Sequence, residues 1–224
     1  MKVRLLLTVC AVAGAIVALP AAPASAASKC SGKGAQGLAS SGSSRVFSLP
    51  SKGERKIYAC LYSQNKRRFL GWFQECQNMT AAREFRLVGP YVAYVEYSCG
   101  LIAGNDSVVV LNIKTGKVVH SAAAATGTEA PGGEATTTVT GLELAATASV
   151  VWIADFDADS GGLGNNAQDD RQVRKFETGE AGPVTVDSGL TIDPESLSLA
   201  KRYGTTNRFY WMKGGSPFTA LLSE

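Results

Sequence analysis

Residues 108–119 read Val-Val-Val-Leu-Asn-Ile-Lys-Thr-Gly-Lys-Val-Val. Apolar and β-branched residues, which favour strands, occupy both ends of this stretch. Between them, Lys114-Thr115-Gly116 has the composition of a turn, and Gly116 can adopt the positive φ that a tight hairpin turn needs. The stretch therefore predicts two antiparallel strands joined by a short turn.

A related pattern occurs four times along the chain: an apolar-x-Leu step, a turn, and an apolar run that contains or ends on a large aromatic residue. The steps begin at Phe47, Phe85, Leu142 and Leu197, and the aromatic residues are Tyr58, Tyr94, Trp152 and Trp211. Each aromatic run is followed by another strand pattern, and the second and third repeats add one more. Such repeats predict an all-β fold of propeller-like antiparallel meanders, with a β-sandwich as the alternative.

The stretch 108–119 also resembles a blade hairpin of quinoprotein-type and related extracytoplasmic β-propellers, in which a Thr-Gly-Lys turn joins the outer strands. The resemblance implies the fold and carries over no active site. We expect Tyr94, Trp152 and Trp211 to pack between neighbouring repeats rather than to form a carbohydrate platform. The last repeat lacks an outer strand, so either residues 31–45 supply it or the array stays open.

The N-terminus has the pattern of a secretory signal peptide. Lys2 and Arg4 precede an apolar run, and Ala24-Ser25-Ala26 is a small-residue cleavage site. The run is shorter than the roughly 20 residues that span a bilayer, so we expect no stable membrane insertion. The prediction is a secreted or extracytoplasmic protein with a signal peptide (1–26), a flexible Gly/Ser-rich arm (27–45) and an all-β repeat domain (46–224).

Four cysteines remain after cleavage: Cys30, Cys60, Cys76 and Cys99. In an exported protein this number predicts two disulfides, and three pairings are open. No C-x-x-C pair is present, so the cysteines do not indicate a zinc site.

The net charge is small. Removing Lys2 and Arg4 with the leader lowers the formal charge from +3 to +1. A near-neutral chain predicts no electrostatic attraction to nucleic acid or anionic membranes. The tight basic run Lys66-Arg67-Arg68 is interpreted as a solvated hairpin tip. We therefore expect the partner to be an extracellular protein or a glycan.

One acidic loop is a candidate metal site. Asp155, Asp157 and Asp159 alternate with other residues before a Gly-rich turn, and such carboxylates can converge on Ca²⁺. The loop departs from an EF-hand because Asn166 stands where a bidentate Glu would be expected. An ordinary flexible loop has the same composition and is the alternative.

The sequence offers no catalytic constellation. The single histidine, His120, is expected to be a half-exposed strand residue, and no G-x-S-x-G motif is present. We expect a secreted, non-catalytic binding module without a cofactor. The alternatives are a glycan hydrolase or lyase that uses two carboxylates from Asp155, Asp157, Asp169 and Asp170, and a structural cell-envelope protein. A short segment, 79–84, is the best candidate for a helix.

Overall fold

A computed structural model describes residues 30–73, 80–99, 104–126, 136–157, 170–200 and 207–222. Their regular structure is β-strand, mainly antiparallel, so the predicted all-β class is confirmed. Residues 79–84 are the best candidate for a helix in the sequence, and this prediction is wrong for residues 81–84, which belong to the strand Ala81–Val88. Within these ranges, no helix is long and apolar enough to cross a membrane.

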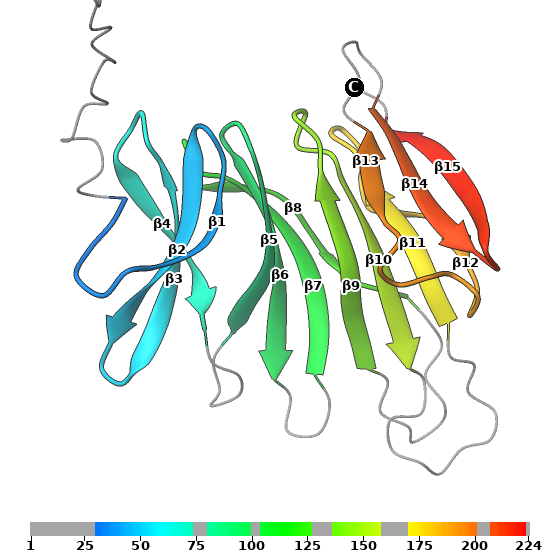
Figure 1. The fold of residues 1–224 in the computed structure, drawn as a ribbon, viewed down its shortest axis with the longest axis horizontal. Helices are drawn as coiled ribbons and strands as arrows, with labels where there is room; N and C mark the ends of the chain where they lie inside the picture. Colours follow the sequence, from blue (N-terminus) through cyan, green and yellow to red (C-terminus); the bar gives the residue numbers. More distant parts are fainter. Residues whose placement is uncertain are drawn as a thin grey trace, which may run out of the picture.

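The strands form four consecutive meanders, here called units 1 to 4 (Figure 1). Unit 1 contains β1 (Gln36–Ser40), β2 (Ser44–Ser51), β3 (Glu54–Leu61) and β4 (Lys66–Trp72). Unit 2 contains β5 (Ala81–Val88), β6 (Tyr91–Cys99), β7 (Gly104–Asn112) and β8 (Lys117–Ala123). Unit 3 contains β9 (Thr136–Leu144), β10 (Val150–Asp157), β11 (Asp170–Phe176) and β12 (Val184–Ser188). Unit 4 contains β13 (Ser198–Ala200), β14 (Asn207–Lys213) and β15 (Ser216–Leu222).

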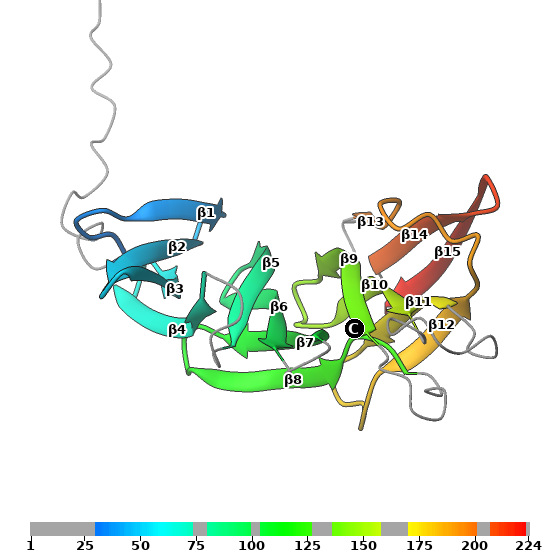
Figure 2. The same cartoon turned by 90° about the horizontal axis from the view of Figure 1, so that it is seen from below.

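The units stand side by side along an arc (Figure 2). Units 1 and 2 meet at one parallel pair, Trp72 with Ala81, and units 2 and 3 meet at another, Asn105 with Thr137. Unit 4 is a separate three-stranded sheet. Among the described strands, β1 pairs with β2 and β15 with β14, so the array is open between its first and last units.

The predicted flexible arm is wrong for residues 36–40, which form β1 on the edge of unit 1. The segment is Gly- and Ser-rich, but β2 supplies antiparallel backbone partners from Gln36 to Ser40, with a bulge between Gly37 and Ala39. Backbone pairing does not depend on side chains, which explains why composition failed to indicate this strand. The strand belongs to the first unit and does not complete the last.

The hairpin predicted from residues 108–119 is present between β7 and β8. Gly116 lies in its turn with φ +77°. A Cβ atom at this position would lie 2.5 Å from Cζ of Arg68, which reaches over from β4. The positive φ favours glycine there, and any side chain at this position would also displace the guanidinium group of Arg68.

Three apolar clusters fill the spaces between neighbouring units. Tyr94 lies between units 1 and 2, Trp152 between units 2 and 3, and Trp211 between units 3 and 4. All three aromatic side chains are buried, as the repeat pattern predicted. Each unit thus buries a sheet face against the next, so that neighbouring units stabilise each other as in repeat proteins. Among the described strands, none packs as a further unit on the outer side of unit 1 or unit 4.

Candidate ligand-binding face of the first unit

The strand register shows which side chains share the outer face of unit 1. Residues directly opposite each other on neighbouring strands point to the same side of a sheet. One cross-strand row is Phe47, Tyr58 and Phe69. The next is Arg45, Cys60 and Arg67, and a third pairs Lys56 with Trp72. We call this side, which faces away from unit 2, the outer face.

The opposite side of the same strands is core. Val46, Ile57 and Ala59 are fully buried and pack against unit 2. Because side chains alternate along a strand, burying these residues forces their neighbours Arg45, Tyr58 and Cys60 onto the outer face. The position of the basic and aromatic residues is therefore fixed by the packing of units 1 and 2.

A short N-terminal segment covers the centre of the outer face. Cys30 forms a disulfide with Cys60, and both pack on Phe47, which is fully buried. Ala35 and Leu49 complete this small apolar cluster. The disulfide confirms one of the predicted bridges. It also covers Phe47 at the outer end of the array formed by the described strands.

Two guanidinium groups flank the ring of Phe47. The Cζ atoms of Arg45 and Arg67 lie 5.2 Å and 5.8 Å from the ring centroid. Such cation–π contacts hold the planar guanidinium groups in place without consuming their hydrogen-bond donors. Arg67 donates from Nη2 to the carbonyl of Ser31 at 2.8 Å. The guanidinium group of Arg45 makes no hydrogen bond or ion pair with any residue that the structure describes.

The β4 side of the outer face is aromatic. Phe69 contacts Tyr58 and Trp72 edge-on, with ring centroids 5.9 Å and 6.0 Å apart. Nζ of Lys56 lies 4.7 Å from the centroid of Trp72. Phe69 remains 52% exposed on this face. Exposed rings beside cations form a surface that can accept a ligand with both apolar and acidic parts.

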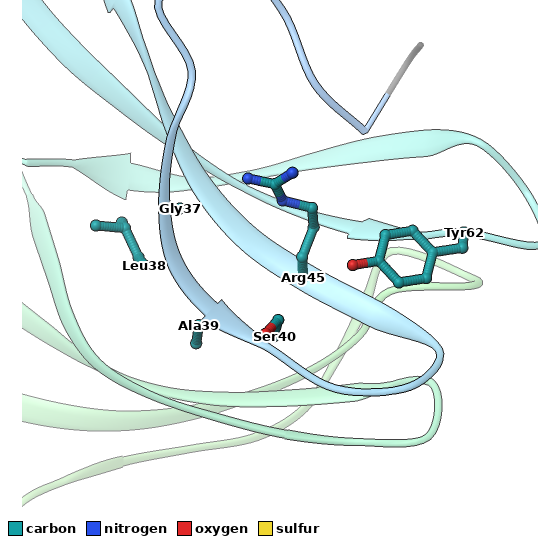
Figure 3. Close-up of a pocket in the computed structure, with 6 residues that line it drawn as sticks. All are labelled: Gly37, Leu38, Ala39, Ser40, Arg45 and Tyr62. Carbon is teal, nitrogen blue, oxygen red and sulfur yellow. The ribbon is translucent and has the colours of Figure 1, made fainter. Parts of the chain in front are cut away.

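A hollow of about 510 Å³ lies at the β1 edge of this face (Figure 3). Its lining residues are Gly37, Leu38, Ala39, Ser40, Arg45 and Tyr62. The Tyr62 hydroxyl is directed toward Arg45 in Figure 3, and among the described residues it has no hydrogen-bond partner. On its other side β1 pairs with no described strand, so its outward backbone groups can bind a ligand. The volume suits a small-molecule fragment or one part of a polymer.

Charge is distributed very unevenly along the chain. Residues 30–73 contain eight basic residues and one acidic residue, Glu54, for a formal charge of +7. Residues 74–224 contain 11 basic and 18 acidic residues, for −7. The small net charge of the whole chain therefore averages a basic N-terminal segment with an acidic remainder, and the absence of attraction to polyanions stays a prediction. Counting charge repeat by repeat would have revealed this in the sequence.

The interpretation of Lys66-Arg67-Arg68 as a hairpin tip is also wrong. All three residues belong to β4. Arg67 lies on the outer face, whereas Arg68 points the other way and donates to the carbonyls of Ile113 and Lys114 in unit 2. Because side chains alternate along a strand, Arg67 lies on the outer surface and Arg68 lies between units 1 and 2.

The structure describes two of the three residues predicted to bind Ca²⁺. Asp155 forms an ion pair with Arg171, with 2.7 Å between Oδ1 and Nε. Asp157 ends β10, and Asp159 lies outside the described residues. Within the described ranges, no three His, Cys, Asp or Glu side chains gather as a metal site. Calcium binding by this loop stays a prediction, with Asp155 already neutralised by a cation.

Among the described carboxylates considered for an acidic enzyme, the sheet separates Asp170 from Asp155. Asp155 faces Arg171 across β10 and β11, whereas Asp170 faces Phe156. Adjacent positions on a strand point to opposite sides, so Asp155 and Asp170 cannot flank one bond. Asp169 lies outside the described residues. Asp155 and Asp157 are two positions apart on β10 and share a side of the sheet, where Asp155 is paired with Arg171. The hydrolase alternative stays a prediction.

His120 is a core residue rather than the half-exposed one expected. It is 5% exposed, and its ring centroid lies 4.2 Å from that of Phe176 in unit 3. Its Nε2 atom is buried without a hydrogen-bond partner in the described structure. Burial lowers the pKa of His120, while the charge of Glu180 opposes this shift. A neutral, enclosed imidazole contributes to packing between units and is not placed to act on a ligand.

The remaining cysteines are not visible as a pair. Cys76 lies outside the described residues, and Cys99 is the last residue of β6. Because Cys30 is bonded to Cys60, only one of the three pairings open from the sequence still gives two disulfides. A Cys76–Cys99 bridge is therefore the surviving prediction.

Comparison with known proteins assigns no family. No family model matches the chain, and no curated protein matches it. Among solved structures, the crystal structure of TolB from Acinetobacter baumannii matches with a TM-score of 0.31 and 15% identity, covering 82% of this chain and 41% of that chain. The chain thus spans about two-fifths of that protein's length. The candidate site is therefore argued from the geometry of this chain alone.

Proposed function

We propose that the protein is a secreted, non-catalytic binding module that holds its ligand at the hollow on the edge of unit 1. One observation carries the proposal: Arg45 and Tyr62 direct polar groups into a hollow beside an edge strand, and neither has a hydrogen-bond partner among the described residues. A guanidinium group held against Phe47 is preorganised for a planar acceptor such as a carboxylate.

The location of the protein fits this role. The Cys30–Cys60 disulfide supports an extracytoplasmic site, because such bonds persist in oxidising compartments. Cleavage after Ala26, as the leader predicts, would leave Cys30 close to the new N-terminus. The disulfide then anchors that terminus over Phe47, so the binding face is ordered before a ligand arrives.

The alternatives receive less support. An acidic hydrolase needs two free carboxylates beside one bond; Asp155 and Asp170 lie on opposite sides of their sheet, and Asp155, which shares a side with Asp157, is paired with Arg171. A purely structural envelope protein gives no reason for a hollow lined by an unpaired arginine and tyrosine. A binding module explains both features with one ligand.

The test uses the mature protein, residues 27–224, with its disulfides oxidised. Binding is measured by biolayer interferometry against immobilised neutral polysaccharides, acidic polysaccharides and unstructured polypeptides. The R45A/Y62F double variant removes both polar groups of the hollow. R208A/Y210F is the matched control, since Arg208 and Tyr210 are exposed on β14 of unit 4. Thermal melts check that both variants fold.

We expect at least one class of polymer to bind, and to bind about tenfold or more weakly to R45A/Y62F, while R208A/Y210F keeps wild-type affinity. Equal losses in the two variants would place the binding surface elsewhere. If no member of the panel binds at concentrations up to the millimolar range, the binding-module proposal is wrong.

A further inference from the structure

We infer that the ligand is an acidic polysaccharide, a polymer whose sugar rings carry repeated carboxylates. This inference rests on the proposed function and names the chemistry of its ligand. It depends on the arrangement of cations around the hollow, on their spacing across the strands, and on the polar groups that line the hollow itself.

The cations extend well beyond the hollow. Besides Arg45, the outer face carries Lys56 and Arg67, and exposed Lys33 lies on the segment that covers its centre. The only acidic residue among residues 30–73 is Glu54. A ligand with one negative charge would need Arg45 alone. A surface with several cations, on a segment (residues 30–73) whose formal charge is +7, instead fits a ligand with repeated negative charges.

The spacing of two of these cations suits an extended chain. Arg45 and Arg67 occupy the same cross-strand row with Cys60 between them. Neighbouring strands are about 4.8 Å apart, so the two backbone positions are separated by roughly 10 Å across the sheet. Both guanidinium groups are fixed by the ring of Phe47. Two fixed forks at this separation can hold acidic groups on different residues of one polymer.

The lining of the hollow favours sugars over nucleotide bases. The hydroxyls of Ser40 and Tyr62 and the free backbone edge of β1 are suited to the hydroxyl groups of a sugar ring. Phe47, the ring that Arg45 and Arg67 contact, cannot stack on a base, because it is fully buried beneath the guanidinium groups and the Cys30 segment. The exposed ring of Phe69, on the β4 side of the outer face, is available for the apolar face of a sugar.

The experiment compares two forms of one polymer. Polygalacturonic acid carries a carboxylate on each ring, and its fully methyl-esterified form has the same backbone without the charge. Affinity of the mature, oxidised protein for both is measured from 50 to 300 mM NaCl. A single-stranded oligonucleotide and polyphosphate serve as other polyanions. The variants are R45E/R67E and, with the same change in net charge, K114E/K117E on the exposed hairpin between β7 and β8.

We expect binding to polygalacturonic acid that weakens steeply with salt, because the contacts are ionic. R45E/R67E should lose about tenfold or more in affinity, K114E/K117E should lose far less, and the esterified polymer should not bind. Thermal melts and quantification of free thiols confirm that R45E/R67E retains its fold and its disulfide.

Two other results would overturn the inference in different ways. Binding to a neutral polysaccharide or peptide through Arg45 and Tyr62, with none to polygalacturonic acid, would refute the acidic ligand and leave the proposed function standing. Tighter binding to the oligonucleotide or polyphosphate, with the same loss in R45E/R67E, would show that the polymer is a phosphate chain. Absence of binding to every polymer in both panels would refute the proposed function as well.

Discussion

Val139 donates its backbone N–H to Oδ2 of Asp106 at 2.6 Å, across the boundary between units 2 and 3. The Asp106 side chain is fully buried, and the same oxygen accepts from Nη2 of Arg83 at 2.6 Å. Burial raises the pKa of Asp106, although the bonds from Val139 and Arg83 act in the opposite direction. A buried carboxylate thus joins β7 to the first strand of the next unit, where only one parallel backbone pair links the sheets.

Removing this carboxylate should loosen the boundary. In Asp106→Ala, the N–H of Val139 loses its acceptor in a buried place, and Arg83 loses its partner. We expect the free energy of unfolding to fall by about 2–4 kcal/mol. Urea denaturation followed by tryptophan fluorescence measures the change. The exposed carboxylate variant Glu195→Gln is the control, and an effect of Asp106→Ala no larger than that of the control would contradict this role.

His120 should make the stability depend on pH. Its pKa is lowered in the folded protein by burial, so below about pH 6.5 the unfolded chain binds a proton that the folded chain resists. The contribution is therefore complete above that pH and is lost as the pH falls, by at most about 1.4 kcal/mol per pH unit. His120→Phe keeps a ring against Phe176 and has no proton to bind. The difference in unfolding free energy between this variant and wild type should grow between pH 7 and pH 5, and a constant difference would exclude the mechanism.

The Cys30–Cys60 disulfide should be a major source of stability. It links residues 30 positions apart and closes the apolar cluster on the outer face of unit 1. The C30A/C60A variant should unfold with about 3–4 kcal/mol less free energy, since the unfolded chain regains the entropy that the bridge removed. Its affinity for the ligand should also fall, because Phe47 and the two guanidinium groups lose their cover. Denaturation curves and the binding assay test these two consequences separately.

The second bridge can be tested without any variant. Non-reducing proteolysis of the mature protein, followed by mass spectrometry, should yield one peptide pair that contains Cys30 and Cys60 and another that contains Cys76 and Cys99. Alkylation before reduction should label no cysteine of the mature chain. Labelling of Cys76 and Cys99 would show that the protein has a single disulfide.

Calcium binding by the acidic loop is tested by thermal melts with 5 mM CaCl₂ and with chelator. A bound ion raises the melting temperature by linkage, whereas a solvated loop leaves it unchanged. The D157N/D159N variant should abolish any calcium-dependent rise, and Asp155→Asn is the comparison because Asp155 is paired with Arg171. A rise that survives D157N/D159N would locate the ion elsewhere.

The local pattern of residues determined much of the architecture. The turn at Gly116, the four aromatic runs and the strands around them follow from β-branched and aromatic residues separated by turn residues. The burial of Tyr94, Trp152 and Trp211 follows from their equivalent places in the repeat. These features depend on neighbours along the chain, so composition and spacing suffice to predict them.

The candidate site was decided by the tertiary structure. Arg45 and Arg67 are 22 positions apart in sequence and meet on Phe47 because β2, β3 and β4 pair in one register. The hollow exists because β2 offers backbone partners to a Gly-rich segment with no strand signal of its own. His120 is buried because unit 3 packs on it. Sequence spacing alone specifies periodicity along a strand, whereas register and contact between units set which distant side chains share a face.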